Sequence, residues 1–177
     1  MARVVRPGAP VLVALLLPLA VPALANPVRN AALDAFARNC VSPHLTAAMA
    51  EAELAPHGRH DFYDLDPFSA DAPSPAATEV TEGTDRRCTL AFDGDHGAAA
   101  AETAAAMLEA EGITREAPLP ITHAPVEGTT LLGARYLNPS RIAVVHVGTR
   151  PGPDGTETFL SVERLTPAAS ARLATSE

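Results

Sequence analysis

The sequence contains no lysine and no tryptophan, and aromatic residues make up only 4% of it. Without lysine the chain can form no P-loop lysine contact to phosphate, no Schiff base and no Ser-Lys dyad. The shortage of aromatic side chains leaves few platforms on which bases or sugars could stack. The composition therefore excludes the lysine-dependent enzyme classes before any motif is considered.

Positive charge is scarce as well. All 13 basic residues are arginines, against 21 acidic residues, which gives a formal net charge of −8. A nucleic-acid-binding protein needs a clustered basic face, and anionic membrane surfaces also attract basic segments. We therefore expect neither nucleic acid nor an anionic membrane surface as a partner.

The N-terminus has the features of a secretory signal peptide. Arg3 and Arg6 precede an apolar run at Val11–Leu24, and small residues flank a cleavage position between Ala25 and Asn26. The alternative is a membrane anchor, but the run is shorter than the roughly 20 residues of a spanning helix, and prolines interrupt it. We expect residues 1–25 to be removed and residues 26–177 to form one periplasmic or secreted domain without membrane insertion.

Only two cysteines are present, Cys40 and Cys88, and both follow the predicted cleavage site. In an oxidising compartment, two lone cysteines are most simply explained by a disulfide. The alternative is a redox pair, but catalytic dithiols usually have Cys-x-x-Cys spacing at a helix start. The sequence therefore predicts a structural Cys40–Cys88 bridge.

Hydrophobic periodicity predicts a single two-layer α+β domain with N-terminal helices, a strand-helix-strand unit and a C-terminal antiparallel meander. The expected helices lie at 29–41, 43–54 and Gly97–Glu111, and a short fourth helix begins at Thr166-Pro167 with Thr166 as its N-cap. The expected strands lie at Arg86–Phe92, Leu119–His123, Thr129–Leu137, Ile142–Val147 and Thr156–Glu163. Ser42 and Asp95 are the expected N-caps of the second and third helices, because short polar side chains accept hydrogen bonds from the first free amides. The strand at Ile142–Val147 reads as buried on both faces, whereas Thr156–Glu163 alternates and reads as half exposed.

Residues 55–84 show no sustained period and are expected to form a long loop. Phe62, Tyr63, Leu65 and Phe68 are expected to dock together on the domain, since large apolar side chains rarely stay in water as a group. Long irregular segments on a rigid scaffold often carry function. This loop is therefore the predicted contact surface.

The same loop contains the only candidates for a metal site, His57, His60 and Asp61. Imidazole and carboxylate groups this close together can bind zinc or a similar ion. The spacing matches no standard zinc signature, however, and a solvated loop whose polar residues flank docking aromatics explains the pattern better. The metal site is kept as the alternative interpretation.

Asp93-x-Asp95 follows an apolar strand and resembles the Asp-x-Asp motif of the haloacid dehalogenase group, which implies phosphoryl transfer to the first aspartate. The resemblance covers about eight residues, and that chemistry also calls on a lysine, which this chain lacks. A turn followed by an N-cap explains the two aspartates better. His146, inside the central predicted strand, is expected to be a hydrogen-bonded core histidine.

In overall layout the chain resembles the small, uncharacterised exported proteins of alphaproteobacteria. The resemblance rests on the Asn-Cys pair at 39–40 and on the segment Asn-Pro-Ser-Arg-Ile-Ala-Val-Val at 138–145. It implies no activity and no functional residues.

The sequence is best explained by a non-catalytic exported binding or accessory domain without a cofactor, monomeric or weakly dimeric, whose ligand is a protein or a small molecule. One alternative is a metal-dependent or other hydrolase that uses the residues at 57, 60 and 61. Another is an envelope assembly factor that pairs an edge of its sheet with a partner strand.

Overall fold

The computed structural model describes residues 26–68 and 72–175. The predicted signal peptide and Ala25 lie outside these ranges. The described elements are α1 (Pro27–Asn39), α2 (Ala47–Glu53), the short 3-10 helix η1 (Ala55–His57), β1 (Arg59–Asp64), β2 (Thr84–Asp93), α3 (Gly97–Ala110), β3 (Glu116–Ala117), β4 (Thr129–Asn138), β5 (Arg141–Gly152), β6 (Gly155–Leu165) and α4 (Pro167–Ala174). In the described ranges, no helix is long and apolar enough to cross a membrane.

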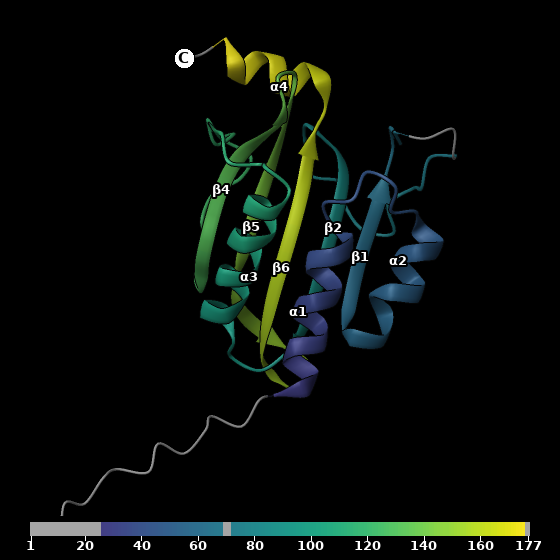
Figure 1. The fold of residues 1–177 in the computed structure, drawn as a ribbon, viewed down its shortest axis with the longest axis vertical. Coiled ribbons are helices and arrows are strands. Elements are labelled where there is room, and N and C mark those ends of the chain that lie inside the picture. Colours follow the sequence, from purple (N-terminus) through teal and green to yellow (C-terminus); the bar gives the residue numbers. More distant parts are fainter. Residues whose placement is uncertain (1–25, 69–71, 176–177) are drawn as a thin grey trace, which may run out of the picture.

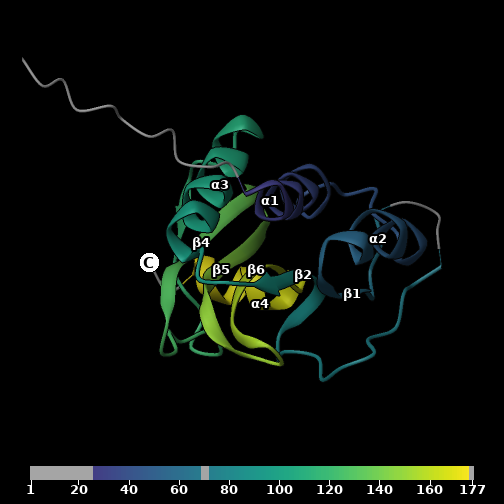
Figure 2. The same ribbon diagram turned by 90° about the horizontal axis from the view of Figure 1, so that it is seen from below.

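The strands form one six-stranded sheet in the order β1-β2-β6-β5-β4-β3, and every neighbouring pair is antiparallel. The last strand in the sequence, β6, therefore lies inside the sheet between β2 and β5 (Figure 1). The predicted α+β class is confirmed, as is the meander β4-β5-β6 with its turn at Pro153-Asp154. The helices α1 and α3 lie against one face of the sheet (Figure 2). On the other face, Ala169 of α4 packs into a smaller cluster with Ile142 and Val144 of β5.

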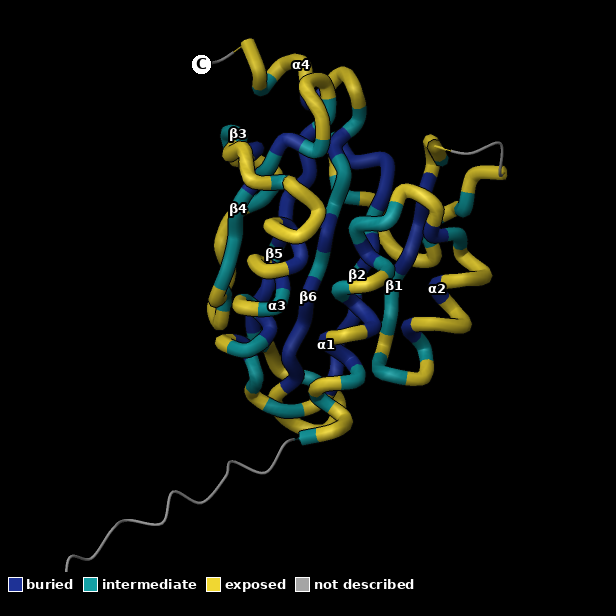
Figure 3. The backbone as a smooth tube through the Cα atoms, in the orientation of Figure 1, coloured by how far each residue is buried: buried dark blue, intermediate teal, exposed yellow. Residues whose placement is uncertain are grey.

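The main core forms where α1 and α3 meet the sheet. Phe36 of α1 packs into one cluster with Leu90, Val145 and Leu160, which belong to β2, β5 and β6, and all four residues are almost fully buried. Burial is concentrated along the central strands (Figure 3). Alanines supply much of the inner face of α3, so its backbone can approach the sheet closely. This packing gives the opposite face a rigid support.

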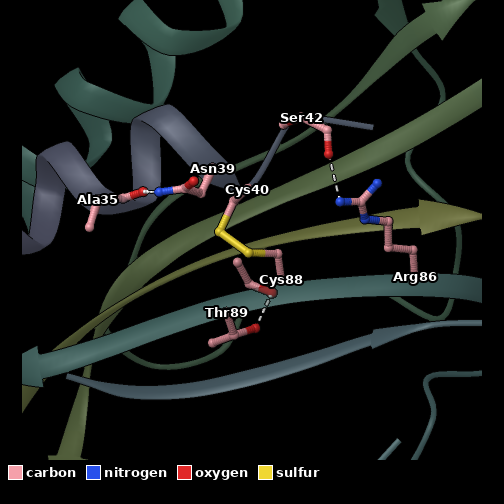
Figure 4. The surroundings of a disulfide bond; sticks show 8 residues. Ala35, Asn39, Cys40, Ser42, Arg86, Cys88 and Thr89 are labelled. Atoms are coloured by element: carbon pink, nitrogen blue, oxygen red, sulfur yellow. Dashed lines mark hydrogen bonds between the residues drawn. A yellow bond between two sulfur atoms is a disulfide. The ribbon is translucent and has the colours of Figure 1, made fainter. Parts of the chain in front are cut away.

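Cys40 directly follows α1 and is joined to Cys88 in β2, as the sequence predicts (Figure 4). The two Cα atoms are 5.3 Å apart. Both residues are buried, and nearby Arg86 donates to the carbonyl oxygen of Ser42 at 2.6 Å. The bridge thus fastens the end of α1 and the segment after it to the sheet.

The predicted strand at Leu119–His123 is wrong. The strand after α3 is β3, which pairs with β4 at only two positions. Pro118 and Pro120 follow it and offer no N–H groups to a ladder, which ends the pairing. β2 and β3 point in the same direction, but β6, β5 and β4 lie between them, so they are not neighbouring parallel strands.

Two predicted N-caps are also wrong. Thr46, not Ser42, caps α2 by accepting from the amide of Met49 at 3.3 Å. His96, not Asp95, precedes α3 and makes no side-chain cap hydrogen bond. Its own amide donates to Thr158 Oγ1 at 2.8 Å, which ties the start of α3 to β6. The predicted cap of α4 by Thr166 is confirmed.

The expectation of a continuous loop at 55–84 is wrong, because η1 and β1 occupy its first part. Phe62 and Tyr63 are 8% and 0% exposed on β1, whereas Leu65 and Phe68 are 42% and 75% exposed. The four do not form one docked cluster, since successive strand residues point to opposite faces of the sheet and Leu65 and Phe68 lie beyond the strand.

Candidate binding site

The face of the sheet away from α1 and α3 carries a row of polar side chains. Asp61, Thr89, Ser161 and His146 lie opposite one another on β1, β2, β6 and β5, and cross-strand partners point to the same face. The hydroxyl groups of Thr89 and Ser161 are 2.7 Å apart and share a hydrogen bond. We refer to this side of the sheet as the polar face.

Arg87 and Glu163 form the centre of the polar face. Arg87 donates from Nε to Oε1 of Glu163 at 2.6 Å and from Nη1 to Oδ2 of Asp61 at 3.0 Å. His123 extends from the loop before β4 and donates from Nε2 to the other oxygen of Glu163 at 2.9 Å. Burial alone would raise the pKa of Glu163, but the hydrogen bonds from His123 and Arg87 outweigh it and the pKa is lowered. This network fastens a loop to the sheet.

His146 is hydrogen-bonded, as the sequence predicts, but it lies on the polar face rather than in the main core. Its Nε2 atom is 2.9 Å from Oγ1 of Thr129, and its ring stands edge-on to Phe159 with the ring centres 5.0 Å apart. Burial lowers the pKa of His146, and the neighbouring His123 lowers it further. The imidazole is therefore neutral at neutral pH.

A hollow of about 380 Å³ opens at the end of the polar face. It is lined by Arg59, His60, Asp61, Thr89, Ala91, Arg150, Pro151, Gly152, Pro153 and Glu157. Arg59 of β1 and Arg150 of β5 both bind the carboxylate of Glu157, whose side chain is only 6% exposed. Burial alone would raise the pKa of Glu157, but the hydrogen bonds from Arg150 and Arg59 outweigh it and the pKa is lowered. At neutral pH the wall of the hollow therefore carries an ionised cluster of Glu157 and two arginines.

Two glycines make this arrangement possible. A Cβ atom on Gly152 would lie 2.9 Å from the Cβ and Oε2 atoms of Glu157, and one on Gly58 would collide with the carbonyl oxygen of Ala91. Neither position has room for a Cβ atom in the close-packed structure. Glycine at these positions lets the β5–β6 hairpin lie over Glu157 and lets the chain enter β1 close beside β2.

The structure separates the predicted metal ligands. His57 lies in η1, and His60 and Asp61 are successive residues of β1, so the last two point to opposite faces. His60 Nε2 is 3.4 Å from a carboxylate oxygen of Glu51 on α2, whereas Asp61 binds Arg87 and the hydroxyl of Thr78. Within residues 26–68 and 72–175, no three His, Cys, Asp or Glu residues gather as a metal-binding group.

Sequence reasoning missed Arg59, Arg150 and Glu157. The register of the β5–β6 hairpin contains a usable signal, because a two-residue turn at Pro153-Asp154 sets Arg150 opposite Glu157. No local pattern indicates that Arg59 joins them from β1. Its partner Asp93, from the Asp-x-Asp motif, accepts its Nη2 hydrogen bond at 2.7 Å.

No protein-family model matches the chain, and neither a curated protein nor a solved structure is significantly similar to it. The site therefore has to be interpreted from its own geometry.

Proposed function

We propose that this chain is an exported, non-catalytic binding domain that takes a small polar ligand in the hollow at the end of the polar face. The observation that carries the proposal is the hollow itself, whose walls combine two guanidinium groups, carboxylates and the hydroxyl of Thr89. Ligand sites of this kind are concave and contain a few polar groups that fix the orientation of the ligand. The strands that supply these groups belong to one rigid sheet.

The disulfide supports the exported location. Structural disulfides persist in oxidising compartments and are rare in the cytosol. Cys40 and Cys88 are joined and buried, so their bridge fits a periplasmic or secreted domain. The predicted signal peptide agrees with that location.

The state of the ionisable groups favours binding over acid–base catalysis. A general acid or base works best with a pKa near the working pH. The pKa of Glu157 is lowered, and this carboxylate is held by two arginines, so it stays ionised. A group fixed in this way orients a ligand but exchanges no proton with it.

Native mass spectrometry of the protein recovered from the periplasm of its own host tests the proposal. Thr89 lines the hollow, so Thr89→Tyr fills it, whereas Thr175→Tyr adds the same side chain at an exposed position outside it. We expect a small-molecule adduct on the wild-type protein and on Thr175→Tyr, and none on Thr89→Tyr. An adduct that persists on Thr89→Tyr, or its absence from the gently purified wild-type protein, contradicts the proposal.

A second candidate function, strand pairing with an envelope protein, is favoured by the outer edge of β4. The amide of Tyr136 donates to the carbonyl oxygen of Arg115, on the side of β4 away from β5. The amides of alternate strand residues point the same way, so those of Ala134 and Leu132 also point to this outer edge. Ala134 pairs with Ala117 at the end of β3, and among the described residues no strand pairs with Leu132 on this outer side. An unpaired edge of this kind can add a partner strand.

A groove of about 220 Å³ lies beside this edge, between α3 and β4. Its lining includes Leu108, Leu131 and Val145, so it offers space for an apolar side chain of an added strand. A photo-reactive residue at Ala105, which lines the groove, should cross-link a partner in the native host, whereas one at Ala106 should not. Equal labelling from both positions contradicts strand pairing at this edge.

A further inference from the structure

Arg150 is held in place by two contacts that leave the end of its side chain free. Its Nε atom donates to Oε1 of Glu157 at 2.6 Å, and its guanidinium carbon lies 5.0 Å from the centre of the Phe159 ring. Within residues 26–68 and 72–175, its two terminal amino groups have no hydrogen-bond partner, and the side chain is 49% exposed. The structure therefore fixes the guanidinium plane and keeps its paired donors available.

Arg59 approaches the same carboxylate from the other side. Its Nε and Nη2 atoms both donate to Oε2 of Glu157, at 3.1 and 2.6 Å, and Nη2 also donates to Asp93. Among the described residues, its Nη1 group has no partner. Glu157 thus anchors one guanidinium from β1 and one from β5, and both side chains line the hollow.

The charges of this cluster decide which ligand fits. Two guanidinium groups face the carboxylates of Glu157 and Asp93, so the cluster is neutral although it has unused donors. Asp61, the other acidic residue of the hollow, is already bound by Arg87. A guanidinium fork matches the two oxygens of a carboxylate, and a singly charged group meets less repulsion from Glu157 and Asp93 than a dianionic phosphate does.

We propose that the hollow binds the carboxylate group of a small organic acid, held end-on by the two terminal amino groups of Arg150 with Arg59 beside it. The inference rests on the proposed binding function and adds the chemical class of the ligand. Pro151, Pro153 and Ala91 line the same hollow, so the remainder of the acid meets apolar surface and the hydroxyl of Thr89.

Titrations followed by NMR at constant ionic strength test this assignment, with acetate, succinate, inorganic phosphate and neutral acetamide as probes. We expect saturable shifts at Phe159, Glu157 and Arg150 with acetate and succinate, and none with acetamide. The affinity should fall at least tenfold in Arg150→Gln. It should fall similarly in Arg150→Lys, because lysine keeps the charge but loses the fork.

The matched control is Arg38→Gln, which removes one exposed arginine of α1. Because α1 lies on the face of the sheet opposite the hollow, this variant should leave the titrations unchanged. Shifts of equal size in Arg150→Gln, or no saturable shifts with either carboxylate, overturn the assignment. Tighter binding of phosphate than of acetate overturns it in favour of a phosphate site. A neutral native adduct that Arg150→Gln still binds removes the carboxylate assignment while leaving the binding function in place.

Discussion

The Nε atom of Arg164 donates to Oδ1 of Asp85 at 2.7 Å, and both side chains are almost completely removed from water. Asp85 is the extra residue of a β-bulge in β2, between the positions that pair with Leu165 and Arg164 of β6. The bulge aims its carboxylate at Arg164 and Arg141, both of which bind it. Burial raises the pKa of Asp85, and the hydrogen bonds from the two arginines partly offset this effect.

We expect Asp85→Ala to lower the free energy of unfolding by about 3 kcal/mol, because it removes a buried carboxylate that binds two largely buried arginines, Arg141 and Arg164. Urea denaturation followed by circular dichroism measures the change. The control is Glu116→Ala, which breaks the ion pair of an 81% exposed carboxylate with Arg135 and should cost less than about 1 kcal/mol. Equal losses in the two variants would show that the burial of Asp85 contributes nothing.

Loss of the disulfide should destabilise the domain strongly. Cys40 and Cys88 are 48 positions apart, and on the chain-entropy model a loop of this length contributes about 4 kcal/mol to the free energy of unfolding. We expect Cys40→Ala/Cys88→Ala to unfold at correspondingly lower urea concentration. Reductant should lower the free energy of unfolding of the wild-type protein but not that of the double variant. A wild-type protein whose unfolding free energy is unchanged by full reduction contradicts the expectation.

Gly152→Ala should disturb the hollow. The new methyl group would lie 2.9 Å from Glu157, so the hairpin or the carboxylate has to move, at a cost of about 1–3 kcal/mol in unfolding free energy. Gly133→Ala is the control, because its added Cβ approaches only the flexible end of Arg135, at 3.3 Å. NMR spectra should show shifts around Glu157 in the first variant alone, and unaltered signals there would contradict the geometry.

The lowered pKa of His146 makes stability depend on pH. Burial lowers the pKa below its usual value of 6.5, so between the folded value and 6.5 the unfolded chain binds more protons than the folded one. The neutral ring therefore stabilises the fold above pH 6.5, and this contribution is lost as the pH falls through the folded pKa. Imidazole titration by NMR should place His146 below 6.5, and His146→Gln should reduce the loss of unfolding free energy between pH 7.5 and 5.0.

Much of the fold follows from local pattern. The meander, the long alanine-rich helix, the cap at Thr166 and the pairing of the two cysteines could all be predicted, because each depends on residues close in sequence or on there being only two cysteines. The half-exposed character expected of β6 is wrong, since Glu157 and Phe159 are buried. A strand that lies between β2 and β5 is covered by side chains from both neighbours, and the sequence does not show its place in the sheet.

The candidate site was harder to predict for the same reason. His57, His60 and Asp61 drew attention by proximity in the sequence, but a strand sends neighbours to opposite faces. Arg59, Arg150 and Glu157 come from three strands that meet only in the assembled sheet. Only the pairing of Arg150 with Glu157 can be predicted from the sequence, because a two-residue hairpin turn sets these residues opposite each other.

The position of β6 at the centre of the sheet also governs how the domain assembles. β2 gains its second neighbour only when β6, residues 155–165, pairs with it. Before β6 pairs, the β1–β2 pair and the β4–β5 pair share no strand. Pairing between segments this distant in the chain makes folding slow, because a long loop must close before the contacts form. A chain that is synthesised from its N-terminus therefore completes this sheet only after nearly all of its residues are present.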